Sequence, residues 1–253
     1  MFIDTHCHLF NEYYDNMDEM INKCMENGIK RIIVSGVDMK SNMEVLELVN
    51  KYDIVYGSIG FHPTELSDFS SDNLDWLEEH INDNKIVAIG EIGLDYHYDD
   101  TDKEKQIDIL KRQLDIAKIY DKPIIFHSRD ALGDTYNILK EYKLRGCIHC
   151  YSGSVEMARE FNKLGYMIGV GGVVTYKNSK VLKEVVKDTD LSYILLETDA
   201  PYLSPEPYRG MKNDSSKIVE IARVIADLKN VSILDISRVT TVNAEHLFDF
   251  SLK

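Results

Sequence analysis

The sequence lacks any apolar run near the roughly 18 residues that a membrane-spanning helix requires. Its first residues also lack the basic and then apolar pattern of a secretory signal peptide, because Asp4 and His6 come almost at once. Low-complexity stretches and linkers rich in glycine and serine are absent as well. We therefore expect a single cytoplasmic domain that covers residues 1–253 and makes no contact with a membrane.

Cysteine is scarce, with 4 residues in a chain of 253. Cys147 and Cys150 have the spacing of a CxxC motif. Residues three apart on a β-strand point to opposite faces, however, so these two side chains cannot hold one metal ion together. We expect each cysteine to be a buried, reduced thiol.

Basic charge is in deficit, because 29 lysines and arginines face 43 aspartates and glutamates, which gives a net charge of −14 at pH 7. A protein that captures nucleic acid broadly by electrostatic attraction needs a basic surface, and this composition excludes such a surface over most of the molecule. A nucleic acid substrate would have to bind locally, around bound cations. Charge alone favours a small metabolite as the substrate.

Short apolar runs that are rich in β-branched residues predict eight strands, at 2–8, 30–35, 54–60, 86–92, 123–127, 146–151, 166–171 and 193–198. Helical patterns separate them, at 17–26, 41–51, 73–82, 103–120, 135–142, 155–164, 180–187 and 216–228. Strands that alternate with helices predict an α/β fold with a parallel sheet, and eight such units favour a (β/α)8 TIM barrel over a doubly wound open sheet. An extra C-terminal helix near 233–247 is expected to pack outside the barrel.

Histidines and carboxylates stand at the ends of five of these apolar runs. The runs read FIDTHCHL at 2–9, IVAIGEIGLDY at 86–96, PIIFHSR at 123–129, GCIHCYS at 146–152 and ILLETDAPYL at 194–203. In a TIM barrel the carboxyl ends of the strands surround the active site, so these side chains are expected to converge there. Six of them have the types and positions of metal ligands: His6, His8, Glu91, His127, His149 and Asp199.

These six residues can form two metal sites. The two histidines of the HxH pair lie side by side on the first strand, and Asp199 on the eighth strand neighbours them in a closed barrel. Glu91 has two oxygens and can bridge to a second ion held by His127 and His149. One such histidine alone is more simply explained as a hydrogen-bonded core residue, but their joint occurrence at successive strand ends predicts a metal-dependent hydrolase. The ligand mixture suits Zn²⁺, Mn²⁺, Co²⁺ or Ni²⁺ and suits Mg²⁺ less well.

Further residues are expected to contact the substrate, namely His62, Arg129, Asp95, Tyr96 and Tyr202. Arg129 is the best fixed cation for a phosphate oxygen, and a salt bridge to Asp95 or Glu197 is its alternative role. His62 follows the third strand and either contacts a phosphate, steadies a ligand or is an exposed loop residue. Asp4 and Glu197 each precede a ligand by two residues and are expected to orient the metal-binding side chains.

The chain resembles the TatD family of metal-dependent deoxyribonucleases, a branch of the amidohydrolase-like barrels, in the segments DTHCHL, GFHP, GEIGLDYH, PIIFHSRDA, HCYSG, ETDAPYL and VNAEHLF. The match covers the whole chain in order. The resemblance implies a TIM barrel with two divalent ions, the first held by His6, His8, Glu91 and Asp199 and the second by Glu91, His127 and His149. Glu91 stands where phosphotriesterase and urease relatives carry a carbamylated lysine. The resemblance also implies DNase activity, in some members a 3′-to-5′ exonuclease.

We therefore expect the protein to cleave phosphodiester bonds of DNA by a hydroxide activated between two divalent ions, with Asp199 and Glu91 as catalytic carboxylates. The expected substrate is single-stranded DNA or a 3′ end, and no obligate protein partner is expected. Two alternatives remain open. An amidohydrolase or a deacylase of D-aminoacyl-tRNA would cleave an amide or ester at the same metal site, and a metal-binding scaffold would have no turnover.

Overall fold

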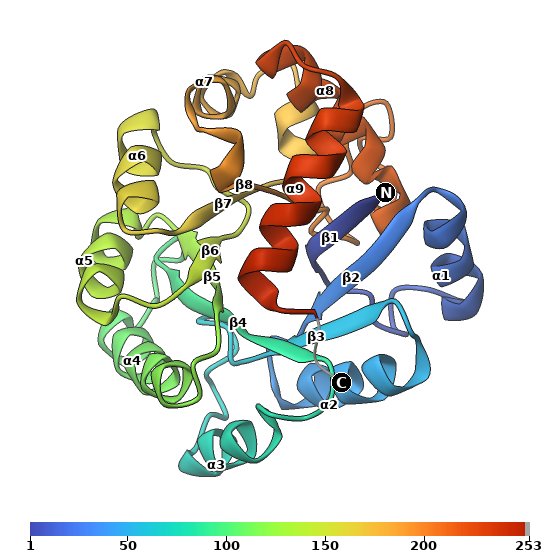
Figure 1. The fold of residues 1–253 in the computed structure, drawn as a ribbon. Helices are drawn as coiled ribbons and strands as arrows, with labels where there is room; N and C mark the ends of the chain where they lie inside the picture. The colour runs from blue at the N-terminus through green and yellow to red at the C-terminus, as the bar shows by residue number, and fades with distance from the viewer. Residues whose placement is uncertain (251–253) are drawn as a thin grey trace.

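Eight parallel strands form the centre of the structure, a computed structural model that describes residues 1–250 (Figure 1). The strands are β1 (Phe2–Cys7), β2 (Ile29–Ser35), β3 (Val55–Ile59), β4 (Ile86–Asp95), β5 (Ile124–Arg129), β6 (Gly146–Ile148), β7 (Met167–Val170) and β8 (Ile194–Leu196). Their order in the sheet is their order in the chain. This confirms the predicted (β/α)8 barrel and excludes a doubly wound sheet, in which the strand order reverses.

The barrel closes where the chain just beyond β8 meets β1. Asp199 N donates to His6 O at 3.0 Å, and His8 N donates to Ala200 O at 2.6 Å. Both hydrogen bonds lie at the carboxyl ends of these strands. The residues that follow β8 are therefore fixed against the HxH segment of β1.

Helices follow the strands and cover the outside of the barrel (Figure 1). They are α1 (Met17–Glu26), α2 (Met39–Lys51), α3 (Ser71–His80), α4 (Lys103–Ile119), α5 (Leu132–Tyr142), α6 (Val155–Lys163), α7 (Lys180–Asp188) and α8 (Ile218–Lys229). Short 3₁₀ helices occur at Gly172–Thr175, Leu191–Tyr193 and Ser215–Lys217. Among the helices of residues 1–250, none has both the length and the apolar character that crossing a bilayer requires.

Two helices begin at residues other than those that the apolar pattern predicted, one earlier and one later. At α2, Ser41 N donates to Asp38 Oδ1 at 2.7 Å, so the helix begins at Met39 and not at residue 41. The last predicted helix before the C-terminal one begins at Ile218, because Ser215–Lys217 forms a 3₁₀ turn. These shifts move boundaries by two residues and leave the order of elements unchanged.

The C-terminal helix α9 (Ile233–Phe248) crosses the amino-terminal end of the barrel (Figure 1). Its Leu247 and Phe248 pack with side chains that point into the barrel, including Ile3 of β1 and Ile125 of β5. The helix thus packs outside the sheet, as predicted, and in addition closes one end of the barrel. The opposite end, at the carboxyl ends of the strands, remains accessible.

Candidate metal centre

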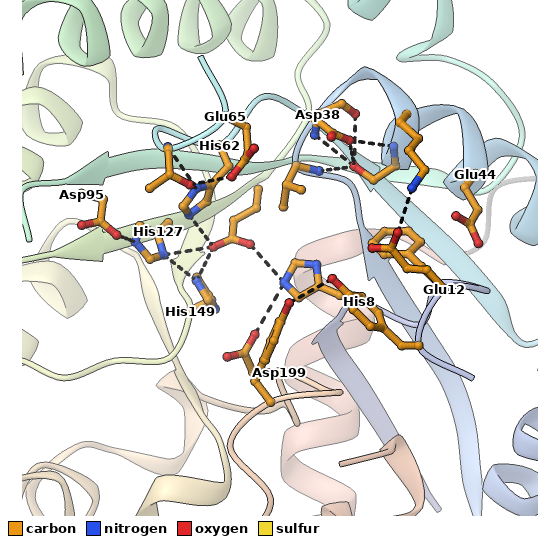
Figure 2. Close-up of a pocket in the computed structure, with 18 of the residues that line it drawn as sticks. His8, Glu12, Asp38, Glu44, His62, Glu65, Asp95, His127, His149 and Asp199 are labelled. Atoms are coloured by element: carbon orange, nitrogen blue, oxygen red, sulfur yellow. Dashed lines mark hydrogen bonds and ion pairs between the residues drawn. The ribbon is translucent and has the colours of Figure 1, made fainter. Parts of the chain in front are cut away.

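The six predicted ligands converge at the carboxyl end of the barrel. Five of them line one cavity, and Figure 2 labels four of these, His8, His127, His149 and Asp199. His6 and His8 come from β1 and the residue after it, Glu91 from β4, His127 from β5, His149 from the residue after β6, and Asp199 from the turn after β8. The strands β6 and β8 are shorter than predicted, so His149 and Asp199 lie just beyond them. Their side chains still point to the shared centre.

One group of donor atoms surrounds His6 Nε2. This nitrogen lies 3.2 Å from His8 Nε2, 3.4 Å from Glu91 Oε2 and 3.5 Å from Asp199 Oδ1. His8 Nε2 lies 3.3 Å from Glu91 Oε2 and 3.6 Å from Asp199 Oδ1. Four atoms bound to one ion at about 2.1 Å in a tetrahedron are themselves about 3.4 Å apart. The measured separations therefore fit one divalent ion.

The other oxygen of Glu91 faces a second group of nitrogens. Glu91 Oε1 lies 2.7 Å from His149 Nε2, 3.0 Å from His127 Nδ1 and 3.4 Å from His62 Nε2. His127 Nδ1 and His149 Nε2 are 3.2 Å apart. Glu91 thus divides its two oxygens between the groups. His62, whose role the sequence left open, lies among the donor atoms and is a candidate ligand of the second group.

Charge in the cluster favours cations. Burial would raise the pKa of Glu91, but the histidines around it, His149, His62 and His6, hold that pKa well below its usual value. Burial lowers the pKa of His8, but the neighbouring carboxylates of Asp199 and Glu91 outweigh it and raise the pKa to about 9. A metal ion must therefore displace a proton from His8, so metal binding is expected to strengthen as pH rises.

The ring nitrogens that face away from the first group are held by β2. His8 Nδ1 donates to the carbonyl oxygen of Ser35 at 2.9 Å. Since a carbonyl can only accept, this bond keeps the proton on Nδ1 and leaves Nε2 free to bind an ion. His6 Nδ1 lies 3.0 Å from Ser35 Oγ, which accepts a hydrogen bond from Ser58 Oγ at 2.8 Å. Ser35 was not among the predicted site residues, although its place at the end of the second apolar run was a signal.

Asp4 does not orient either histidine ring, which corrects the role predicted for it. Its Oδ1 accepts a hydrogen bond from Thr198 N at 3.0 Å, and its Oδ2 accepts one from Thr198 Oγ1 at 2.5 Å. The reason is the closure of the barrel, which brings Asp4 of β1 against the segment beyond β8. Asp4 therefore fixes the residue that precedes Asp199.

Glu197 is fully buried beneath Asp199. Its Oε1 accepts a hydrogen bond from the backbone N of Cys150 and lies 3.9 Å from His149 Nδ1, which is too far for a hydrogen bond. Glu197 thus supports the backbone beside a ligand. It does not orient the His149 ring directly, which corrects the role predicted for it. The carboxyl group fits because Gly169 has no side chain: a Cβ there would lie 2.1 Å from Glu197 Oε2.

Asp95 has a more specific position than the predicted substrate contact. Its Oδ2 accepts a hydrogen bond from His127 Nε2 at 3.0 Å, which leaves Nδ1 of that ring facing Glu91. Asp95 also lines the cavity. It is therefore the carboxylate that orients a candidate ligand, the role that had been expected of Asp4 and Glu197.

A cavity of about 680 Å³ opens above the two donor groups. Arg129 and Tyr202 line it, as predicted, and Arg129 has no carboxylate within salt-bridge distance among residues 1–250. Tyr96 is not among the lining residues, which corrects its predicted role. Its hydroxyl donates to Asp134 Oδ2 at 3.0 Å, because the chain turns outward after β4. Tyr98, two residues later, lines the cavity instead.

A cluster of histidines and carboxylates at this end of a TIM barrel is typical of metal-dependent hydrolases. The chain matches the model of the family described as TatD related DNase over residues 3–249. It belongs to this family, and it is a metal-dependent hydrolase of the TatD type.

Relatives of similar length support this assignment. The chain is 41% identical over 252 residues to the uncharacterized metal-dependent hydrolase YabD of Bacillus subtilis, and the match covers 98% of this chain and 99% of YabD. It is 32% identical over 253 residues to the uncharacterized metal-dependent hydrolase YcfH of Escherichia coli K12, over 97% of this chain and 95% of YcfH. The crystal structure of YjjV, a TatD homolog from Escherichia coli K12, superposes with a TM-score of 0.94 at 33% identity over 98% of both chains.

Proposed function

We propose that this hydrolase cleaves phosphodiester bonds of DNA and releases nucleotides from 3′ ends. The observation that carries the proposal is the position of the two carboxylate oxygens of Glu91, each of which faces a different group of donor atoms at the base of one cavity. This arrangement has room for two divalent ions, and paired ions are common in enzymes that displace an oxygen from phosphorus. Membership of the TatD related DNase family supports DNA as the substrate.

The candidate ligands of the first ion are His6, His8, Glu91 and Asp199, and those of the second are Glu91, His127 and His149, with His62 beside them. Their nitrogen-rich composition suits Zn²⁺, Mn²⁺, Co²⁺ or Ni²⁺ better than Mg²⁺. When bound, such ions supply positive charge that lowers the pKa of water and stabilises negative charge on phosphate oxygens.

Asp199 is suited to accept the proton of the attacking water. Hydrogen bonding to His6 and His8 outweighs the effect of burial and holds the pKa of Asp199 below its usual value, so the carboxylate is ionised. Its side chain is 14% exposed, against 4% for Glu91, so Asp199 is the more accessible of the two from the cavity. The water oxygen bonds to phosphorus, the P–O3′ bond breaks in line, and the 3′ oxygen takes up a proton. The products are a 5′-mononucleotide and a strand shortened by one nucleotide.

Arg129 is suited to hold a non-bridging oxygen of the phosphate. It lies two residues beyond His127, lines the cavity, and is exposed at the end of β5. A guanidinium in this place can donate two hydrogen bonds to a phosphate and offset part of the charge that develops on it. His62 is the less suitable partner, because its Nε2 faces Glu91.

The direct test uses single-stranded DNA that carries a label at its 5′ end, incubated with the protein and either Mg²⁺ or Mn²⁺. We expect a ladder of products that shortens from the 3′ end. The acidic rim of the cavity favours a small substrate, so a panel of amides, esters and D-aminoacyl-tRNA is the comparison. If members of that panel are hydrolysed while the DNA stays uncleaved, the result contradicts the proposal and favours an amidohydrolase or deacylase. No turnover of any substrate would favour a metal-binding scaffold.

The role of Asp199 gives a second prediction. Asp199→Ala is expected to lower kcat on DNA by about 10²–10⁴-fold, the usual range for loss of a proton acceptor. Glu197→Ala is expected to cost less, because that side chain contacts the backbone of Cys150 and not the reacting atoms. Metal content is measured in both variants, so that loss of an ion is recognised. Equal residual activity in two metal-loaded variants would contradict the assignment.

A further inference from the structure

Two tyrosines stand together at the mouth of the cavity, beside His8. Tyr13 Oη and Tyr202 Oη are 3.0 Å apart, and their ring centroids are 6.1 Å apart. The ring centroid of Tyr202 also lies 6.1 Å from that of His8. Both tyrosines line the cavity, and we call them the aromatic pair. They lie within reach of any ligand that is bound over the first group of donor atoms.

Buried hydrogen bonds fix the backbone of Tyr202. Asn213 is fully buried, and its Nδ2 donates to Tyr202 O at 2.7 Å and to Thr198 O at 2.8 Å. Tyr202 N donates to Asp199 O at 2.9 Å. The same network therefore positions Tyr202 and Asp199 relative to each other. Although its backbone is held in this way, the Tyr202 side chain is 50% exposed, so an accessible ring face is available at a fixed place.

The two ends of the cavity differ in charge. Arg129 lies at one end, on the strand that carries His127, and there it offsets part of the negative charge of Asp95 and Glu65, whereas the end with the aromatic pair carries three carboxylates. The carboxylates of that acidic end are Glu12, Asp38 and Glu44, which Figure 2 shows on the side of His8. Lys40 neutralises Glu12 at 2.8 Å, which leaves a surplus of negative charge. A phosphate is repelled there, while an uncharged ring is not.

We propose that the aromatic pair stacks the nucleobase of the nucleotide that is released, and that the phosphates of the remaining strand lie toward Arg129. This inference rests on the proposed function and adds a base-binding subsite to it. Aromatic side chains bind bases of every kind, because each base has a π-face. The subsite therefore requires a base but does not select one, and the acidic end limits it to a single nucleoside.

The test compares two single-stranded oligonucleotides, one with an ordinary 3′-terminal nucleotide and one whose terminal sugar is an abasic tetrahydrofuran. Wild type is expected to remove the ordinary nucleotide with a kcat/KM about tenfold higher, the usual effect of one base–aromatic stack. Tyr202→Ala is expected to lose about tenfold on the ordinary substrate and nothing on the abasic one, so the ratio approaches one. Tyr202→Phe keeps the ring and is expected to keep the preference.

Tyr98→Ala is the matched control. Tyr98 is 53% exposed, close to the value for Tyr202, and it lines the same cavity at the opposite end, where the Arg129 guanidinium lies 5.9 Å from its ring. Its replacement is expected to leave the ratio between ordinary and abasic substrates unchanged. A collapse of the ratio in this variant as well would overturn the assignment to the aromatic pair.

Binding without turnover gives an independent readout. An oligonucleotide with 2-aminopurine at its 3′ end is expected to lose fluorescence on binding to wild type, because stacking quenches this base, and to keep it on binding to Tyr202→Ala. Two results would overturn the stacking proposal and leave the proposed DNase activity intact. One is an equal loss of kcat/KM on both substrates in Tyr202→Ala, and the other is quenching by Tyr202→Ala that is as strong as quenching by wild type. Failure of wild type to shorten the ordinary oligonucleotide would overturn both.

Discussion

Single residues in this site titrate differently although all are buried carboxyl groups. Burial raises the pKa of Asp4 to about 6 and the pKa of Glu197 to about 8. Glu91 and Asp199 face histidines, which outweigh burial and keep both pKa values low. Environments that separate the pKa values of neighbouring acids also separate their roles. Negative charge is thus concentrated on the two carboxylates that face the candidate ion positions.

The raised pKa of Glu197 predicts a pH-dependent stability. Below its ordinary pKa of 4.5 the group is protonated in both the folded and unfolded states, and between 4.5 and about 8 only the folded state keeps the proton. The folded state therefore loses stability as pH rises through this window. Glu197→Gln has no proton to lose in this window, so its stability does not fall with the ionisation of residue 197. The free energy of unfolding of the variant minus that of wild type is therefore expected to increase by a few kcal/mol from pH 5 to pH 8, since each pKa unit is worth about 1.4 kcal/mol.

The measurement is urea unfolding of both proteins at pH 5 and pH 8 in the presence of a chelator. The chelator matters because bound ions would change the charge around Glu197. A difference between the variant and wild type that stays constant across this range would contradict the prediction.

The candidate ligands could be predicted from the sequence because their pattern is simple. Each stands at the end of an apolar run, and the alternation of a strand decides which way it points. The place of Ser35 at the end of the second apolar run put it near the site, but its contacts with the two histidine rings and the partners of Asp4 could not be predicted, because they depend on which atoms meet across neighbouring strands. Tyr96 was misplaced for a related reason: strand alternation ceases to apply once the chain turns after Asp95.

At the scale of elements, α9 gives the barrel a closed end. The helix packs on side chains from several strands, and its contacts include the last turn of the helix around Leu247 and Phe248. One end of the sheet is thereby sealed with apolar side chains, and polar chemistry is confined to the other end. The helix therefore contributes to the site by stabilising the barrel that carries it.

Two apolar positions on this helix, one buried and one exposed, test that role. Phe248→Ala is expected to reduce the free energy of unfolding by about 3–5 kcal/mol, because Phe248 is 1% exposed and leaves a cavity at the barrel end. Leu234→Ala, on the same helix, is expected to change it by at most about 0.5 kcal/mol, because Leu234 is 75% exposed. Chemical denaturation measures both. Similar losses in the two variants would show that α9 does not seal the barrel through Phe248.

The order and type of elements were predictable, while some bounds and the position of α9 were not. Repeated apolar runs predicted all eight strands, but β6 and β8 have only 3 residues each, fewer than the runs at 146–151 and 193–198. An amphipathic pattern shows that one face of α9 is buried. The pattern does not show what covers that face. The sequence therefore could not predict that α9 closes the amino-terminal end of the barrel.

At the scale of the whole molecule, the net charge of −14 predicts a weak salt dependence of the proposed DNA cleavage. Each phosphate that a cation neutralises contributes a slope of about −0.7 to the plot of log affinity against log salt for single strands. With Arg129 as the main phosphate contact, the slope of log kcat/KM is expected to be near −1 between about 50 and about 200 mM salt. A slope steeper than about −3 would contradict local binding and indicate a wider cationic surface.

The closure between β8 and β1 has a consequence for the nascent chain during its synthesis. Asp4 and Thr198, which bond across this seam, are 194 residues apart, and the hydrogen bond from Asp199 to His6 spans a similar stretch. While the polypeptide is still emerging from the ribosome, the first histidines have no aspartate to meet. Hydrolytic activity that depends on Asp199 can therefore begin only after the segment beyond β8 has left the ribosome and has met β1.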